Sequence, residues 1–340
     1  MQIKTVPEDF VVDEIPAYEP SGEGNHVYLR VKKRDVATDV AIRTIANALG
    51  VHPRDVGVAG MKDKRAVTTQ WMSLEPPRGT TVDDFMSRAT KLEKSHLGDG
   101  IEIIDVKRHG NKLKTGHLHG NRFRIVVRGV PDGKSFVEKA EKVAVTGVPN
   151  AFGEQRFGKE ADNAKRALAI LSGQEKAPRD ARLLRLLYSS LQSDVFNCVL
   201  EERVRRGTWA TALRGDVLKK TDTGGLFVCT DEQQDAARAE RGEVSATGPL
   251  PGPKMLRAEG EVAALEDEIA RARLGAAYDE AFAGELGEGT RRALRLFVKE
   301  MRVTCNSVAN ASGLEETSCT IEFVLPKGAF ATTVVGHLMG

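Results

Sequence analysis

The sequence predicts an α+β protein in which a helix-rich domain is inserted into a strand-rich one. Strand-like patterns dominate the chain as far as Gly158, and helical patterns follow. Strand character then returns only at Thr320–Leu325. This order indicates an insertion, because the two parts of a host domain flank the guest domain. A chain of 340 residues is long enough for about two domains with cores of their own.

The strand-rich part begins with two predicted strands, Phe10–Ile15 and His26–Val31. In the second, apolar residues alternate with other types, so one set is expected to face the core and the other to face outward. The inward set is Val27, Leu29 and Val31, and the outward set is Tyr28, Arg30 and Lys32.

A helix is predicted next over Thr38–Leu49, with Thr38 as its N-cap and Gly50 as its C-terminal stop. Further strands are predicted over residues 56–59, 66–74, 101–106 and 122–128. The last of these alternates apolar residues with arginines, so it is expected to present one face to the core and a basic face outward.

The helix-rich part contains predicted helices over residues 161–171 and 181–206, and helix resumes near Glu259. Apolar residues recur at helical spacing in the second helix, at Leu184, Leu187, Leu191, Val195 and Val199. Clusters of glycine and proline at residues 224–225 and 248–253 predict loops. A short helix from Ala329 is expected to close the chain.

One predicted turn, within AGMKDKRAVTTQ (residues 59–70), concentrates charges of both signs. Asp63 stands there among Lys62, Lys64 and Arg65. The cations favour an ionised carboxylate and would attract a phosphate backbone. The loop can therefore present a reactive anion to an anionic substrate. The alternative is an exposed turn whose surface ion pair contributes little.

The net charge of +2 is unevenly distributed along the chain. Residues 88–134 contain eleven Lys or Arg against five Asp or Glu, whereas residues 231–274 contain ten acids against six bases. A basic half predicts a surface that binds a polyanion. The alternative is a chance distribution of solvated charge.

Composition narrows the class of protein further. Hydrophobic residues make up 41% and charged residues 29%, as is usual for a globular chain. No apolar run approaches the roughly 18 residues of a membrane span, and the N-terminus lacks the pattern of a secretory signal, so a cytoplasmic protein without a membrane partner is expected. The cysteines show no C-x-x-C spacing, which predicts reduced thiols and neither a zinc site nor a disulfide framework. They are Cys198, Cys229, Cys305 and Cys319.

Four separated segments resemble the TruD family of pseudouridine synthases. In chain order they are AGMKDKRAVTTQ, PNAFGEQRFG (residues 149–158), LLYSSLQSDVFN (residues 186–197) and EFVLPKGAFATTVV (residues 322–335). Lys4 with the following PEDFVVDE, and GEGNHVYLRVKK, are similar to that family too. The resemblance therefore covers both ends of the chain and its middle.

This resemblance implies isomerisation of uridine to pseudouridine in tRNA, typically at position 13, on a base flipped out of its stack. The family's catalytic aspartate corresponds to Asp63, its active-site lysine to Lys4, the nearby asparagine to Asn150 and the stacking aromatic to Phe152. The implied fold is a pseudouridine-synthase catalytic core with a mixed, mainly antiparallel sheet, and an inserted helix-rich α/β domain, the TRUD domain, that forms the second wall of a basic cleft. The core would comprise residues 1–175 and 297–340, and the insertion residues 176–296.

The chemistry of this isomerisation fits the residue types. The bond from the ribose to N1 of uracil breaks and is remade to C5 of the same base, without oxidation, hydrolysis or a group carrier. No cofactor and no metal are expected, in keeping with a sequence that lacks a P-loop, a dinucleotide fingerprint and metal-ligand spacing. The reaction needs a carboxylate beside the nucleotide and a flat surface for the detached ring. Asp63 and Phe152 are the residues expected to supply them.

Each of these residues has a structural alternative. Phe152 can be a core aromatic, Asn150 can cap local backbone, and Lys4 can lie in a disordered terminus. Gln70 is expected to be an ordinary surface residue and His26 a structural histidine.

Two other functions remain open at this point. One is a tRNA-binding or tRNA-folding protein without catalysis, in which Asp63 would cost affinity by facing a polyanion. The other is a cofactor-free hydrolase, which would need a second carboxylate that the motif does not provide. The residues do not choose between attack by the aspartate and a glycal route, and they identify no acceptor for the C5 proton. A monomer is expected.

Overall fold

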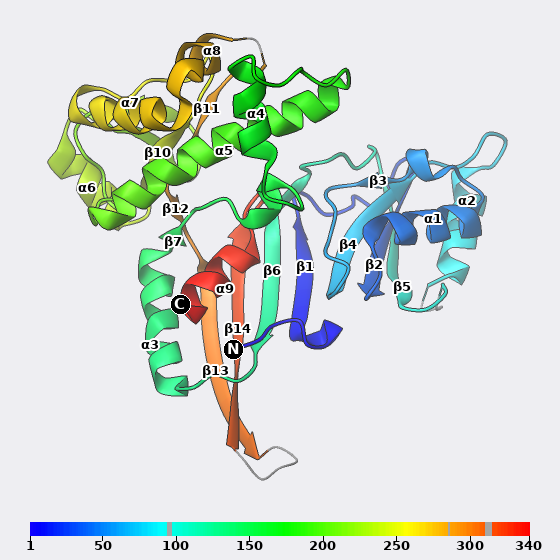
Figure 1. Ribbon diagram of the computed structural model, residues 1–340. Coiled ribbons are helices and arrows are strands. Elements are labelled where there is room, and N and C mark those ends of the chain that lie inside the picture. The colour runs from blue at the N-terminus through cyan, green and yellow to red at the C-terminus, as the bar shows by residue number, and fades with distance from the viewer. Residues whose placement is uncertain (94–96, 285, 310–314) are drawn as a thin grey trace. The chain divides into compact units, whose positions relative to one another are not determined.

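A computed structural model describes residues 1–93, 97–284, 286–309 and 315–340, which form two compact units (Figure 1). Unit 1 comprises Met1–Ala144, Val298–Ala331 and Met339. Unit 2 comprises Val145–Phe297, Thr332–Leu338 and Gly340. Most of the second unit is thus a single insertion between two parts of the first, as an α+β protein with an inserted domain requires.

The sheet of unit 1 is mixed and mainly antiparallel. Its order is β13-β14-β6-β1-β4-β2-β5, with β3 paired to β4. Strands β1 and β4 are parallel, and the other pairings in this sheet are antiparallel. The strands are β1 (Phe10–Pro16), β2 (His26–Arg34), β3 (Gly57–Val58), β4 (Val67–Leu74), β5 (Ile101–His109), β6 (Leu118–Val127), β13 (Lys299–Ala309) and β14 (Glu315–Pro326).

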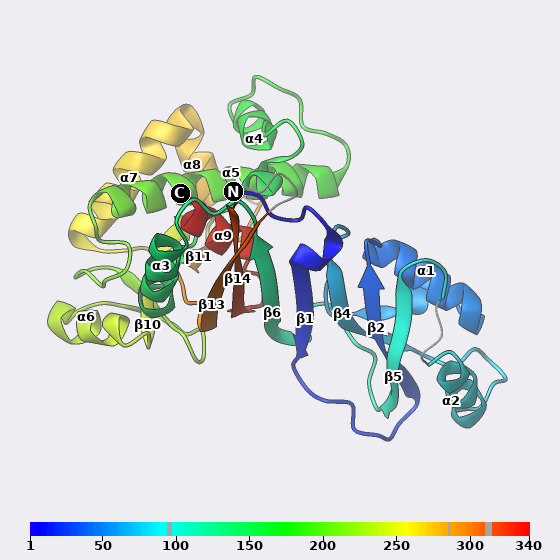
Figure 2. The same cartoon turned by 90° about the horizontal axis from the view of Figure 1, so that it is seen from below.

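Helices α1 (Thr38–Leu49) and α2 (Val82–Lys91) cover one face of β2 and β5 (Figure 2). Their apolar residues join the inward residues of β2 in one buried cluster, so the predicted alternation of Val27, Leu29 and Val31 is confirmed. Gly50 ends α1 at φ +71°, a left-handed conformation that favours glycine. A further helix, α3 (Gly133–Thr146), buries Phe136, Ala140 and Val143.

The outward position predicted for Tyr28 is wrong. Its side chain is buried and packs with Trp71, Leu113 and Leu118. The hydroxyl of Tyr28 donates to the backbone oxygen of Asn111 at 2.9 Å. A connecting segment therefore covers the second face of the sheet at this point, which the alternation within one strand does not show.

Unit 2 combines helices with a four-stranded sheet of order β11-β10-β8-β9. The long helix α5 packs against α7 and against β10 (Figure 1). The helices are α4 (Asn163–Leu171), α5 (Ala181–Arg205), α6 (Glu232–Glu240), α7 (Gly260–Leu274) and α8 (Tyr278–Ala283), and α9 (Ala331–Met339) closes the chain. The strands are β8 (Val217–Lys220), β9 (Leu226–Val228), β10 (Val244–Leu250) and β11 (Thr290–Ala293). Among the described residues, no helix is both long enough and apolar enough to cross a membrane.

The expectation that strand character returns only at Thr320 is therefore wrong. Strand β10 contains Gly248 and Pro249, which the sequence pattern assigned to a loop. A Cβ at Gly248 would lie 2.9 Å from a ring carbon of Phe196, so glycine allows α5 to approach the strand closely.

The chain enters and leaves unit 2 through two paired strands, β7 (Val148–Pro149) and β12 (Arg295–Leu296). The guanidinium of Arg295 donates to the backbone oxygens of Val145, Thr146 and Ala239. Burial lowers the pKa of Arg295. Entry and exit therefore lie side by side within this unit, as an inserted domain requires.

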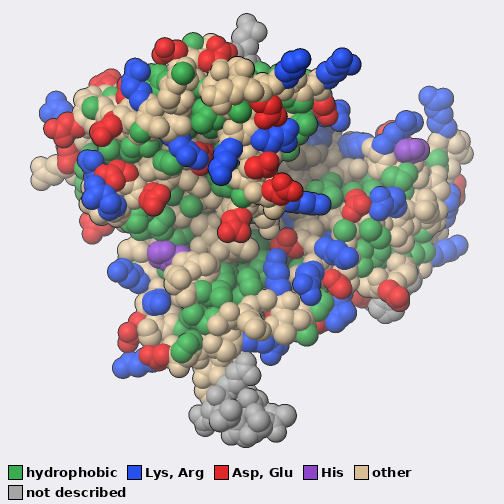
Figure 3. Space-filling model, viewed as in Figure 1, with side chains coloured by type: hydrophobic (Ala, Val, Ile, Leu, Met, Phe, Trp, Pro, Cys, Tyr) green, Lys and Arg blue, Asp and Glu red, His purple; other side chains and the backbone are tan. Residues whose placement is uncertain are grey.

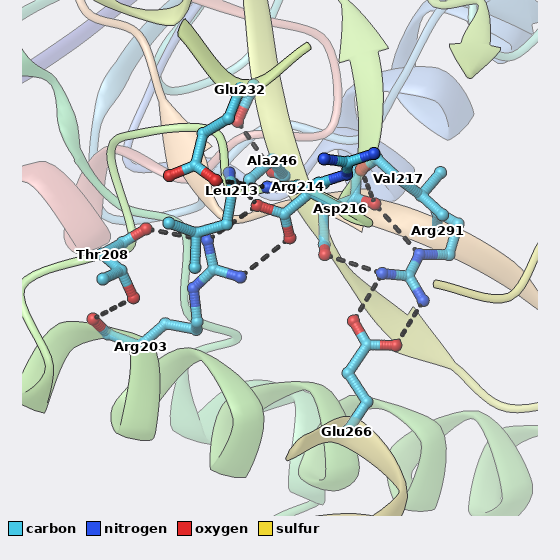
Figure 4. A network of polar contacts seen from close by, with 12 residues as sticks. Arg203, Thr208, Leu213, Arg214, Asp216, Val217, Glu232, Ala246, Glu266 and Arg291 are labelled. Atoms are coloured by element: carbon cyan, nitrogen blue, oxygen red, sulfur yellow. Dashed lines mark hydrogen bonds and ion pairs between the residues drawn. The ribbon is translucent and has the colours of Figure 1, made fainter. Parts of the chain in front are cut away.

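Buried ion pairs organise the interior of unit 2 (Figure 4). Arg203 donates to both carboxylate oxygens of Asp216, at 2.8 and 3.0 Å. Arg291 donates to both carboxylate oxygens of Glu266, at 2.7 and 2.6 Å, and also to Thr247. Bidentate pairs of this kind fix one relative arrangement of the elements that carry them.

The prediction that all four thiols are reduced is wrong for two of them. Cys305 and Cys319 face each other in register on β13 and β14 and form a disulfide. Cys198 and Cys229 are free. Sequence spacing did not show the pairing because it depends on the register of a long hairpin.

Candidate active site

Asp63 lies in the exposed loop between β3 and β4, in unit 1. About half of its side chain is accessible, at 48%. The ammonium of Lys4 is 3.4 Å from its Oδ2 atom. The structure therefore brings together two residues that are far apart in the sequence, and it leaves the carboxylate open to solvent.

Lys4 has an unusual backbone conformation, and its ammonium contacts the ring of Phe10. Its φ angle is +57°, a left-handed conformation that is uncommon for a residue with a side chain. Its Nζ lies 4.0 Å from the centroid of the Phe10 ring, which is buried at the start of β1. Strained backbone of this kind often occurs at functional sites.

A buried lysine, Lys33, supports the Asp63 loop from beneath. Its Nζ donates to the backbone oxygens of Asp63, at 2.7 Å, and of Val36, at 2.8 Å. Burial lowers the pKa of Lys33 to about 8, against a smaller raising effect of the Asp63 charge and with a further lowering by Lys62. The backbone of the candidate catalytic residue is thus fixed by a buried cation.

Two further side chains fix the loop. The hydroxyl of Thr38 accepts from the Lys62 backbone N–H at 3.0 Å and lies 3.2 Å from the Lys62 backbone oxygen. Ala37, not Thr38, is the N-cap of α1, so the predicted capping role is wrong. Gln70 donates to the backbone oxygen of Gly60 at 3.1 Å and is buried, so the expectation of a surface residue is also wrong.

Lys62 does not face solvent with the other cations of the loop. Its ammonium is 2.8 Å from Oε2 of Glu14, and both side chains are buried. The other carboxylate oxygen of Glu14 accepts from the Trp71 backbone N–H. This pair ties the loop to β1 and β4, and it leaves Lys64 and Arg65 as the loop's exposed cations.

Asn150 lies in unit 2, next to β7, and its amide is engaged by protein atoms. The Nδ2 atom donates to the backbone oxygen of Ala293 at 2.8 Å. The Oδ1 atom accepts from Arg292 at 2.7 Å, and the Asn150 backbone oxygen accepts from the same side chain at 3.2 Å. Asn150 therefore holds a guanidinium that the sequence did not single out.

That guanidinium stacks on Phe152, also in unit 2. The Cζ atom of Arg292 is 4.0 Å from the ring centroid, and Cζ of Arg156 is 5.5 Å from it. The edge of the ring meets Phe196, and the backbone of Phe152 exchanges two hydrogen bonds with the side-chain amide of Asn197. Phe152 as a whole residue is of intermediate exposure, and its ring is contacted on several sides.

Many cations of the basic segment meet acids from elsewhere in the chain. In unit 1, Arg108 pairs with Asp83, Arg122 with Glu300, Arg124 with Glu322 and Arg128 with Asp9. Figure 3 shows basic and acidic side chains intermixed over the face that it draws. The sequence count therefore overstates the positive charge of this segment.

His26 is the first residue of β2. Burial lowers the pKa of His26, whose residue pairs with His109 across β2 and β5. Among the described residues, no group of three His, Cys, Asp or Glu side chains is placed to hold a metal ion.

Comparisons with known proteins assign the chain to a family. The family model for tRNA pseudouridine synthase D (TruD) matches residues 1–177 and 178–337. The tRNA pseudouridine synthase D of Anaeromyxobacter sp. (strain Fw109-5) is 45% identical over 99% of this chain and 92% of its own length. A protein of the same name from Thermus thermophilus is 38% identical, over 99% of this chain and 88% of its own.

A solved structure shows the same fold. The crystal structure assigned to tRNA pseudouridine synthase D of Methanosarcina mazei superposes with a TM-score of 0.79 at 24% identity, covering 99% of this chain and 93% of that one. By family match and by full-length similarity, the chain belongs to the tRNA pseudouridine synthase D (TruD) family.

Proposed function

We propose that this protein isomerises uridine to pseudouridine in tRNA, at position 13, with Asp63 as the essential catalytic residue. The observation that carries the proposal is an accessible aspartate on a rigidly held loop, in a chain of the TruD family. The curated relatives bear the name tRNA pseudouridine synthase D. A uridine flipped out of its stack can reach a carboxylate that is open to solvent.

The proposed role of Asp63 is to act on the target nucleotide while the glycosidic bond is exchanged. The bond from C1′ to N1 breaks, a bond from C1′ to C5 forms, and the proton leaves C5 as N1 gains one, so atoms and charge balance. Lys4, 3.4 Å from Asp63, would orient the carboxylate as a positive point charge beside it. Lys33 and Thr38 would keep its backbone in place.

In unit 2, Phe152 is proposed to stack on uracil, and Asn150 to contribute to binding by holding Arg292. Because Arg292 already lies over the ring, the base would use the part of the Phe152 surface that remains accessible. We propose residues 1–175 and 297–340 as the catalytic domain and 176–296 as the inserted TRUD domain. Residues 145–175 would then belong to the catalytic domain although they lie in unit 2 of the structure. The enzyme is proposed to act in the cytoplasm, as a monomer, without a cofactor or a metal.

The direct test incubates the purified protein with unmodified tRNA and maps pseudouridine at single-nucleotide resolution. We expect product at position 13 of the substrate tRNA. Tight tRNA binding without product, under conditions in which a curated relative is active, would instead indicate a tRNA-binding protein.

Lys33→Met is expected to slow product formation by on the order of 10²-fold, the scale of a roughly 1 Å misplacement of a catalytic group. The cause is loss of the hydrogen bond to the Asp63 backbone oxygen, and tRNA affinity should stay close to that of the wild type. Lys32→Met, the neighbouring exposed lysine, is the matched control and should leave the rate unchanged. Equal rates for Lys33→Met and the control would refute the role assigned to Lys33.

The pH dependence gives a second readout of Lys33. Its pKa in the folded protein is about 8, below the 10.5 of a free lysine, so the ammonium loses its proton as pH rises through 8. Single-turnover rates should therefore fall above pH 8. The unfolded chain binds more protons than the folded one between these values, so this group makes the unfolding free energy rise with pH in the same interval. Above pH 8 the single-turnover rate should therefore fall while the unfolding free energy rises. Lys33→Met should show neither of these pH dependences.

Phe152→Leu is expected to reduce the stabilisation of the transition state by about 1–3 kcal/mol, the usual contribution of one aromatic–base stack. The matched control is Phe227→Leu, because Phe227 packs on the same apolar cluster and also lies beneath an arginine, Arg238, at 5.2 Å. Both variants should lose similar stability in thermal unfolding. Only the first should lose kcat/KM, and a similar loss in both would assign Phe152 to packing alone.

A further inference from the structure

Two guanidinium groups of unit 2, those of Arg156 and Arg292, converge on one aromatic ring. Their Cζ atoms lie 5.5 and 4.0 Å from the centroid of Phe152. Burial lowers the pKa of both side chains, and for Arg292 it does so to about 10, with a further lowering from the charge of Arg156. The two cations are thus close enough to repel each other in a partly dehydrated place.

No carboxylate of the described residues forms an ion pair with either arginine. Of the buried arginines of this unit, Arg203 binds Asp216 and Arg291 binds Glu266, whereas Arg295 is held by backbone oxygens. Arg156 and Arg292 are half-buried, and two adjacent cations of this kind without an anion carry a cost from repulsion and partial desolvation. An anionic ligand would offset that cost.

The hydrogen bonds leave donors available for such a ligand. Arg292 uses Nε and Nη2 on Asn150, and Arg156 uses Nε on the hydroxyl of Ser193 and Nη2 on the backbone oxygen of Ser189. Within the described part of the chain, the Nη1 atom of neither arginine donates to a protein acceptor. Both side chains are therefore fixed at one side of the guanidinium and free at the other.

We propose that Arg156 and Arg292 form a phosphate-binding site that takes a phosphodiester of the substrate RNA beside the base that stacks on Phe152. Fixed guanidinium forks match the geometry of phosphate oxygens. Asn150 is then a positioning residue, which orients Arg292 through its side-chain and backbone oxygens. The choice of RNA as the source of the phosphate rests on the proposed function.

The test measures the salt dependence of RNA binding. Affinity for unmodified tRNA is followed against salt concentration in an Asp63→Asn background, so that substrate is not consumed. The slope of log K against log salt is negative, and each lost phosphate contact should reduce its magnitude by about 0.7–0.9. Arg292→Gln and Arg156→Gln should each show this decrease, with at least about tenfold weaker binding at moderate salt. Arg292→Lys should keep the slope, because the positive charge remains. It should bind tRNA more weakly, because lysine lacks the forked donors of a guanidinium.

The matched control is Arg241→Gln, an exposed arginine of the same unit that pairs with Glu243. It should leave the slope unchanged. A second arm replaces chloride with inorganic phosphate at constant ionic strength, which should weaken tRNA binding to the parent protein more than to Arg292→Gln. Thermal unfolding checks the fold of each variant, and Arg156→Gln decides the question if Arg292→Gln is unfolded.

Unchanged slopes in both glutamine variants would overturn the phosphate site. This result is distinguishable from failure of the proposed function, because binding is measured without product. A protein that makes no pseudouridine but shows the decrease in slope would keep the phosphate site and lose the catalytic proposal. Equal competition by inorganic phosphate in parent and variant would also count against the site.

Discussion

Asp63→Asn is expected to abolish pseudouridine formation and to leave tRNA binding intact or slightly stronger. The expected loss in single-turnover rate is on the order of 10⁴-fold, between the values typical of a lost general base and of a lost nucleophile. The amide has nearly the shape of the carboxylate, and the contacts that fix this residue's backbone come from Lys33. The loop should therefore keep its conformation while the reactive anion is removed.

Binding should not suffer, because the carboxylate repels phosphates and contributes no attraction to them. A fluorescence or filter-binding titration with unmodified tRNA measures this independently of product. Asp39→Asn is the matched control, since Asp39 is also an accessible aspartate of unit 1 and pairs with Arg43 on α1. The control should modify tRNA at the wild-type rate. Product formation by Asp63→Asn at a rate close to that of the control would remove Asp63 from the mechanism.

The charges of one short segment singled out Asp63 as a candidate, and the resemblance to the TruD family added Lys4, whose ammonium the structure places 3.4 Å from Asp63. The strands that flank the Asp63 loop, and the extent of α1, also follow from local alternation, helical spacing and a terminal glycine. Each of these features depends on residues close together in the chain, so one short segment is enough to predict it.

The support beneath Asp63 was not predicted, because it comes from residues distant in sequence. Lys33 extends the inward set of Val27, Leu29 and Val31 by one more step, so the alternation did contain a signal for a buried lysine. Glu14 likewise follows Phe10 and Val12 at a period of two, whereas Gln70 gave no such signal because residues on both faces of β4 are buried.

Unit 2 shows the same limit. Arg292 lies far along the chain from Asn150 and Phe152, and only the return of the chain beside β7 brings them together. A count of charges along the sequence could not show which cations have acidic partners, as the pairing of Arg128 with Asp9 illustrates. Sequence patterns thus singled out the candidate catalytic residues but not the residues that contact and position them.

Arg291→Met is expected to destabilise unit 2 by about 3–5 kcal/mol, the usual cost of removing one partner from a buried ion pair. It leaves the carboxylate of Glu266 in the interior without its guanidinium (Figure 4). Thr247 also loses two hydrogen bonds. Urea unfolding is best followed by Trp209 fluorescence in a Trp71→Phe background, because the one remaining tryptophan then reports on unit 2 alone. Lys254→Met breaks an exposed pair with Glu288 and should cost less than about 1 kcal/mol.

The pH dependence of the single variant separates an unpaired charge from a packing defect. Burial already raises the pKa of Glu266 in the intact protein, and loss of Arg291 would raise it further. The folded state then binds more protons than the unfolded state, so the stability of Arg291→Met should increase as pH falls through the raised pKa. The double variant Arg291→Met/Glu266→Leu removes both charges and should recover most of the loss, without that pH dependence. If the double variant is as unstable as the single one, the cost lies in packing and in the Thr247 contacts, and the buried charge is not its cause.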